Sequence, residues 1–168
     1  DSHRRQRQMC IRDSYCSGAT SQDAQPLNIS SNENYFYRNY GKNYSKVSVM
    51  MRYLQHYLGE EKLDIIMQDY YESWKFKHPG PKDFLSFFNK HLDEDINWFF
   101  ENMIDSTTYI DYKISKKNGK YFLENVGSFN AMAEVAYYDG DNQEINRIWV
   151  RPKPVSYTHL TLPTMAIV

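Results

Sequence analysis

The chain has 168 residues, of which 20 are Lys or Arg and 21 are Asp or Glu, so its formal net charge is −1. This length suits about one domain, and the absence of excess positive charge argues against a nucleic-acid partner. Two cysteines cannot build a disulfide scaffold, and no apolar run is long enough to be a membrane segment.

The two ends of the chain are related through the genetic code. Residues 4–13 read RRQRQMCIRD and residues 155–164 read VSYTHLTLPT. The first segment can be encoded by CGT CGG CAG CGT CAG ATG TGT ATA AGA GAC, and the reverse complement of this DNA encodes the second segment without a mismatch. The DNA also resembles the adapter of transposase-based sequencing libraries. We therefore predict that residues 1–14 and 154–168 are translated adapter and do not belong to the native protein.

This prediction removes several apparent signals. The following basic residues no longer indicate a nucleic-acid-binding arm: Arg4, Arg5, Arg7 and Arg12. Cys10 leaves with them, and the remaining Cys16 is interpreted as a loop cysteine without a disulfide or zinc partner in the chain. Fold and function must then be argued from residues 15–153, which we expect to be a fragment of a longer protein.

The first part of this segment predicts helices. Residues 15–34 are rich in Ser, Asn, Gln and Asp and predict a loop. From Tyr44 to Leu58, apolar residues recur in steps of three or four, which predicts a helix. Gly59 suits the end of that helix, and a second amphipathic stretch covers residues 60–74. A tight turn between the two helices favours an antiparallel hairpin.

Two further helices follow a corner at residues 78–81. Pro81 can open the first of them. Asp93 is predicted to be the N-cap of the second, which reaches Ile104. This last helix is apolar nearly all round, so we expect it to be buried against more than one neighbour.

After Asp105 the sequence alternates as β-strands do. The predicted strands cover residues 109–114, 120–126, 131–138 and 144–150, with turns at residues 118–119 and 139–141. The predicted fold class is therefore α+β. Antiparallel helices occupy residues 15–108, and the first strands of a β-sandwich occupy residues 109–153.

The chain contains no complete active-site motif. The sequence lacks a His-Glu-x-x-His zinc motif, a Gly-rich phosphate loop and a Gly-x-Ser-x-Gly elbow. His56, His78 and His91 are spaced too irregularly for a metal site and are predicted to be surface or corner histidines. The acidic run at residues 93–95 is explained by a helix N-terminus. We expect the chain alone to bind no catalytic metal.

An ordered set of short segments carries a family resemblance. They read YSK at residues 44–46, LGEE at 58–61, MQDYY at 67–71, WKFKHP at 74–79, DF at 83–84, WFF at 98–100 and DYKI at 111–114. In this order and spacing they resemble the gluzincin aminopeptidases, the membrane alanyl aminopeptidase and leukotriene hydrolase family, and are closest to bacterial members. The resemblance covers nearly all of residues 26–150. It implies that residues 15–108 end a thermolysin-like catalytic domain and that residues 109–153 open the β-sandwich domain after it.

The resemblance also implies an activity. Family members use Zn²⁺, bound by two histidines and a glutamate, to hydrolyse N-terminal residues from peptides. These ligands are missing here, so zinc and the peptide substrate are assigned to the parent protein, and the fragment is predicted to be inactive. One family residue carries over: Tyr44, followed by Lys46, matches the tyrosine whose phenol donates a hydrogen bond to the oxyanion of the tetrahedral intermediate. The sequence departs from the family at Val47, where Gly is frequent, and at residues 92–94, where Ser-Gly is expected.

Other interpretations remain open. The helices could form a protein-interaction module without catalytic activity, in which case the gene would encode no zinc-binding helix upstream. The β part could bind carbohydrate through a row of exposed aromatics, although most aromatic residues have the spacing of a helical core. Tyr44 itself could be a packing residue.

Overall fold

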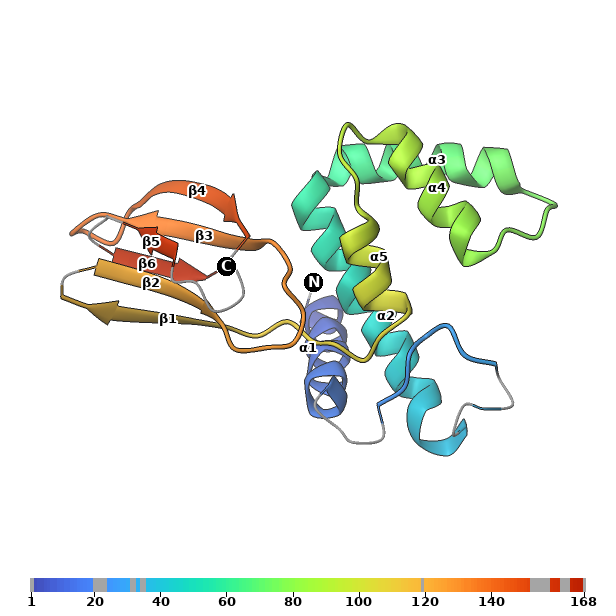
Figure 1. The fold of residues 1–168 in the computed structure, drawn as a ribbon, viewed down its shortest axis with the longest axis horizontal. Helices are drawn as coiled ribbons and strands as arrows, with labels where there is room; N and C mark the ends of the chain where they lie inside the picture. Colours follow the sequence, from blue (N-terminus) through green and yellow to red (C-terminus); the bar gives the residue numbers. More distant parts are fainter. Residues whose placement is uncertain are drawn as a thin grey trace. The chain divides into compact units, whose positions relative to one another are not determined.

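The structure is a computed structural model that describes residues 2–19, 24–30, 33, 36–118, 120–151, 158–160 and 164–167. The chain divides into two compact units, Asp1–Thr107 and Thr108–Val168. All helices lie in the first unit and all strands in the second, within the described residues (Figure 1). The predicted α+β class is therefore confirmed.

The helical unit contains five described helices. These are α1 (Ser2–Ala19), α2 (Phe36–Leu58), α3 (Glu60–Trp74), α4 (Pro81–His91) and α5 (Asn97–Ile104). The predicted helices are confirmed, although α2 begins at Phe36 rather than Tyr44. The loop prediction holds for residues 24–30 but is wrong for residues 15–19, which are part of α1. Arg, Gln and Met in the preceding segment have high helix propensity, so a helix can form there without an apolar face.

The α1 helix contributes little to the folded core. It contacts α2, yet its described residues supply no large apolar side chain that is buried. Met9 is among the exposed hydrophobic residues of the chain. The assignment of residues 1–14 to translated adapter stays a prediction.

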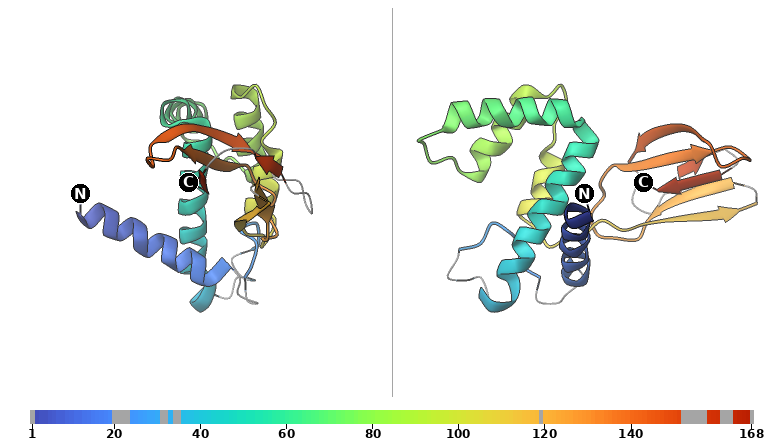
Figure 2. Two further views of the ribbon diagram at one scale, coloured as in Figure 1. Left: turned by 90° about the vertical axis from the view of Figure 1, so that its left-hand side faces the viewer. Right: turned by 180° about the vertical axis from the view of Figure 1, so that it is seen from behind.

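The connection between α2 and α3 differs from the prediction. Gly59 is the single residue between the two helices, and its φ of 88° is the positive value expected at a helix end. Because a reversal into an antiparallel pair needs a loop of about two to five residues, one residue is too short. Figures 1 and 2 show that α3 instead leaves the end of α2 at a steep angle and that α3 and α4 lie side by side.

The start of α5 also differs from the prediction. Asp93 is not the N-cap, because the helix begins at Asn97 with Ile96 in the cap position. Asp95 fills the capping role from a neighbouring place, since its carboxylate accepts hydrogen bonds from the backbone and side-chain nitrogens of Asn97 at 2.7 and 2.9 Å. Glu94 accepts a hydrogen bond from the Tyr57 hydroxyl at 2.7 Å. Two residues of the acidic run, Glu94 and Asp95, therefore have structural roles.

The helical core is assembled from α2 to α5. Its buried apolar side chains are Met50, Leu54, Leu63, Ile66, Phe88, Leu92, Ile96, Phe99, Phe100 and Met103. Aromatic pairs extend this core: the Tyr53 ring stacks on Phe99 at 5.7 Å, and Phe84 meets Phe100 edge to face at 5.4 Å. Each fully buried phenylalanine contributes about 2–3 kcal/mol. The expected burial of α5 against more than one neighbour is confirmed, since Phe99 packs on α2 and Phe100 packs on α4.

The second unit is built from antiparallel hairpins. Strands β1 (Tyr112–Lys117) and β2 (Lys120–Asn125) pair, as do β3 (Ala133–Tyr138) and β4 (Glu144–Val150). Two short strands, β5 (Thr158–Leu160) and β6 (Thr164–Ile167), lie beside β2 and β3 within the segment that the sequence predicts to be adapter. The core is formed by Leu123, Ala133, Val135 and Tyr137, with partly buried residues of β1 and β4 packed against it. Interpretation of these strands as the opening of a β-sandwich domain stays a prediction.

The first strand begins later than predicted because its leading residues have other partners. The backbone of Tyr109 and Asp111 accepts hydrogen bonds from residues 126–129, at distances of 2.9–3.1 Å. Gly127 lies where these two backbone segments approach each other most closely. A Cβ atom there would come within 2.6 Å of both the Asp111 nitrogen and the Tyr109 oxygen.

No helix in the described part of the chain has the combination of length and apolar character that crossing a membrane requires.

We predict that Gly127→Ala destabilises the β unit by about 1–3 kcal/mol, because backbone atoms would have to move away from the new methyl group. The measurement is the urea midpoint, followed by the fluorescence of Trp149 in a background where Trp74 and Trp98 of the helical unit are replaced by Phe. Gly140→Ala is the matched control, since a Cβ atom at Gly140 meets nothing within 4 Å. It should change stability by about 0.5 kcal/mol or less. Equal effects of the two substitutions would contradict the close backbone contact at Gly127.

Candidate functional site

Tyr44, the predicted site residue, lies near the middle of α2 on its outer face. Its side chain is 62% exposed, and its neighbours Val47 and Ser48 are also exposed. The Ser48 hydroxyl donates a hydrogen bond to the Tyr44 carbonyl at 2.8 Å. Tyr44 is therefore not part of the buried core, and its catalytic role stays a prediction.

The inner face of α2 explains this orientation. Lys46, Met50 and Leu54 follow one another at intervals of one helical turn, and all are buried. Residues two positions apart on a helix point in nearly opposite directions, since each residue turns the helix by about 100°. Burial of Lys46 in the core therefore directs Tyr44 to the surface.

Lys46 is the residue that sequence reasoning missed. It was recognised only as the last member of the Tyr-x-Lys segment, yet its side chain is 9% exposed. Its ammonium donates a hydrogen bond to the Ser106 carbonyl at 2.8 Å, across 60 residues of sequence. Its burial could have been predicted from its position about one helical turn before Met50, in line with the apolar stripe of α2.

The acceptor of this bond belongs to Ser106, which follows the C-terminal end of α5 at Ile104 and its C-cap residue Asp105. Helix ends of this kind leave carbonyl groups without helical partners and carry partial negative charge, which favours a cation. Other segments satisfy the neighbouring groups: the backbone nitrogens of Leu27 and Asn28 donate to the Ile104 carbonyl at 2.9 and 3.1 Å. The Asn28 side chain donates to the Asp105 carboxylate at 3.1 Å. We call these residues, with Lys46 and Ser106, the α5 anchor.

The buried position changes the proton affinity of the lysine. Loss of hydration disfavours the charged ammonium and lowers the pKa of Lys46 to about 8 from its ordinary value of 10.5. The bond to Ser106 and the end of α5 act in the opposite direction, so burial is the stronger effect. Keeping the Lys46 ammonium charged inside the fold therefore costs free energy.

The histidines have structural surroundings. His56 and His78 are exposed, as predicted. His91 is half-buried, stacks on Phe87 at 4.2 Å and forms a hydrogen bond with the Phe87 carbonyl at 2.8 Å through Nδ1. Its Nε2 lies 3.9 Å from the Asp69 carboxylate. Among the residues that the structure describes, no three His, Cys, Asp or Glu side chains come together in a group that could hold a metal ion.

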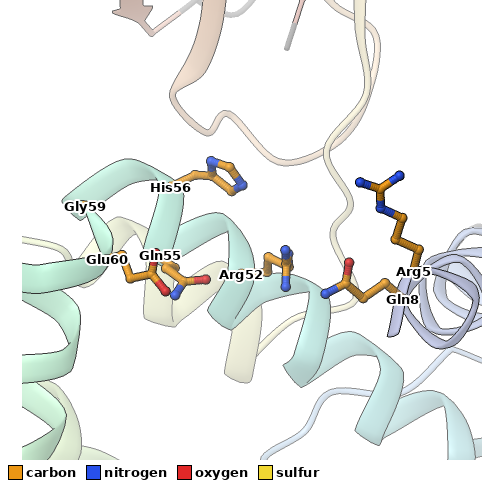
Figure 3. Close-up of a pocket in the computed structure, with 7 residues that line it drawn as sticks. All are labelled: Arg5, Gln8, Arg52, Gln55, His56, Gly59 and Glu60. Carbon is orange, nitrogen blue, oxygen red and sulfur yellow. The ribbon is translucent and has the colours of Figure 1, made fainter. Parts of the chain in front are cut away.

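A polar pocket of about 540 Å³ opens between α1 and the α2–α3 corner (Figure 3). Its described lining consists of Arg5, Gln8, Arg52, Gln55, His56, Gly59 and Glu60. Arg5 and Gln8 lie in the segment predicted to be adapter, and Tyr44 is not part of the lining. The pocket is therefore separate from the predicted site residue.

We predict that the helical unit becomes more stable as the pH rises from about 7 to 9. Above its folded-state pKa of about 8, Lys46 is neutral in the folded chain but still protonated in the unfolded chain. The unfolded state then binds more protons, so the free energy of unfolding increases by about 1 kcal/mol over this range. Burial raises the pKa of Tyr70 above its ordinary value of 10.0, so Tyr70 does not contribute to this change between pH 7 and 9.

The measurement is urea denaturation followed by helical circular dichroism at both pH values. Lys46→Met should abolish the increase, whereas Lys62→Met, at an exposed lysine of α3, should retain it. A wild-type chain whose stability shows no more pH dependence than Lys46→Met would contradict the burial of this charge.

The family of the chain follows from its similarity to known proteins. No curated protein and no solved structure matches the chain significantly. A family profile described as "Peptidase family M1 domain" matches residues 4–103, a range that contains Tyr44, Lys46, all of α2 to α4 and α5 up to Met103. The match begins inside the segment predicted to be adapter, and it does not test that prediction. Since the match covers more than half of the 168 residues, the chain belongs to peptidase family M1, a family of zinc aminopeptidases.

Proposed function

We propose that this chain is a fragment of a bacterial-type gluzincin aminopeptidase that hydrolyses N-terminal residues from peptides. On this proposal, residues 15–108 are the end of its catalytic domain and residues 109–153 the start of the next domain. The observation that carries the proposal is the family match over residues 4–103 together with the exposed phenol of Tyr44. An interaction module without catalytic activity would account for the helices but not for the match.

The described residues do not fit a zinc site, since they contain no suitable group of ligands. We therefore assign the metal to a part of the parent protein that these residues do not include, and we derive no step of the reaction through it. What this chain would supply is a positioned hydrogen-bond donor.

Tyr44 suits that role chemically. A phenol with an ordinary pKa near 10 is neutral at physiological pH and can donate its proton in a hydrogen bond without losing it. When a peptide carbonyl becomes tetrahedral, negative charge develops on its oxygen. A fixed donor aimed at this oxygen stabilises the transition state by about 3 kcal/mol, with little effect on substrate binding.

The position of Tyr44 on α2 supports this function. The helix is held by a buried apolar stripe, so a side chain on its outer face has a fixed origin. Donors on rigid elements are more effective than donors on mobile loops, because their geometry needs no reorganisation during the reaction.

We predict that the chain alone has no peptidase activity, because its described residues lack a metal-binding group. The measurement is release of the product amine or fluorophore from aminoacyl-amide substrates by the purified 168-residue chain, with and without added Zn²⁺. Turnover that a chelator abolishes would show that the chain carries its own catalytic metal and would refute the proposed division.

We predict that Tyr44→Phe in the zinc-loaded parent enzyme lowers kcat by about 10²–10³-fold and leaves KM nearly unchanged, since the phenol contributes mainly in the transition state. Tyr71→Phe is the matched control: Tyr71 is 64% exposed on α3, close to the 62% of Tyr44. This control should keep full activity. A Tyr44→Phe enzyme as active as the Tyr71→Phe enzyme would remove Tyr44 from the reaction.

A further inference from the structure

We propose that Lys46 is a positioning residue for Tyr44. Its hydrogen bond to Ser106 fixes the rotation of α2 about its own axis and thereby aims the phenol on the opposite face. This inference rests on the proposed function of Tyr44 and adds a second residue to the same site.

Apolar packing alone does not fix the rotation of α2 about its axis. Met50 and Leu54 hold α2 against the core, but hydrophobic contacts are non-directional and tolerate small rotations. A hydrogen bond between an ammonium and a carbonyl has a preferred length and angle. Lys46 adds one such directional contact to the stripe, at the end of it that is nearest to Tyr44.

The second step concerns the acceptor, which is held in place itself. The Ser106 hydroxyl donates to the Asn102 carbonyl at 2.6 Å, which ties the residue back to the last turn of α5. The Asp105 nitrogen donates to the Glu101 carbonyl at 3.2 Å, and its side chain is bonded to Asn28. Lys46 is therefore attached to a fixed group at the end of a buried helix.

The third step is the geometry of the helix. Lys46 and Tyr44 point about 200° apart, so a rotation that moves one inward moves the other along the surface. Side chains reach about 5–6 Å from the helix axis, and a rotation of roughly 10° displaces their tips by about 1 Å. A displacement of this size at a reacting group can reduce the rate by about 10²-fold.

The fourth step explains why a lysine occupies this place. An apolar side chain would continue the stripe without the cost of removing a charge from water. It would also lack the bond to Ser106. Only a long side chain that ends in a donor can lie in the stripe and reach the end of α5, where the helix dipole strengthens the contact. The penalty at Lys46 is thus consistent with a positioning role rather than with stability alone.

The experiment is a double-substitution cycle in the zinc-loaded parent enzyme. Lys46→Met is expected to lower kcat about 10–100-fold with little change in KM, and Lys62→Met is the control with unchanged kinetics. Because Lys46 acts through Tyr44, the double variant Lys46→Met with Tyr44→Phe should be no slower than Tyr44→Phe alone. Lys46→Leu, which also lacks a donor, replaces Lys46→Met if the latter does not fold, with the same non-additivity expected.

A readout without catalysis uses the 168-residue chain itself. With ¹³C-labelled tyrosine, Lys46→Met should shift or broaden the Tyr44 ring signals and leave those of Tyr71 unchanged, whereas Lys62→Met should alter neither. Additive losses in the cycle, or unaltered Tyr44 signals in Lys46→Met, would overturn the positioning role. Full activity of Tyr44→Phe would instead overturn the proposed function, so the two failures are distinguishable.

Discussion

The hydrogen bond between the Lys46 ammonium and the Ser106 carbonyl is the directional contact that we propose fixes α2 in the helical unit. It joins α2 to the end of α5 across 60 residues of sequence and lies at the head of a buried stripe that includes Met50 and Leu54. Apolar burial supplies most of the stabilising free energy of this unit. On the proposed positioning role, the polar contact adds direction, and the outward orientation of Tyr44 follows from the buried face of α2 as a whole.

This division between core and surface makes the functional proposal physically coherent. A hydrogen-bond donor for a developing oxyanion must be fixed before the reaction begins, since reorganisation during the reaction would reduce its effect. A helix held on one face by packing and by a buried ammonium meets this requirement. Membership of peptidase family M1 provides the chemical context in which an exposed tyrosine on such a helix has a use.

Much of the fold could be predicted because apolar periodicity records burial. The stripe of α2, the glycine at residue 59 and the strand over Glu144–Val150 are all visible in the sequence. The angle between α2 and α3 was not predictable from composition, since it depends on a single connecting residue. The N-cap of α5 was assigned to Asp93 rather than to its neighbours because three acidic residues in a row give no local basis for choosing among them. Tyr44 could be identified only through the family motif, and Lys46 was missed because a lysine beside polar residues normally indicates a solvated position.

We propose that residues 15–153 come from a zinc aminopeptidase and that the segments at both ends are translated from foreign DNA. The most direct measurement is the sequence of the intact gene on both sides of this segment. We predict that codons for a His-Glu-x-x-His helix and a later glutamate precede the codon for Tyr15, and that the codons for residues 1–14 and 154–168 are absent. A gene that reads unchanged through both ends, or that encodes no metal-binding helix upstream, would contradict it.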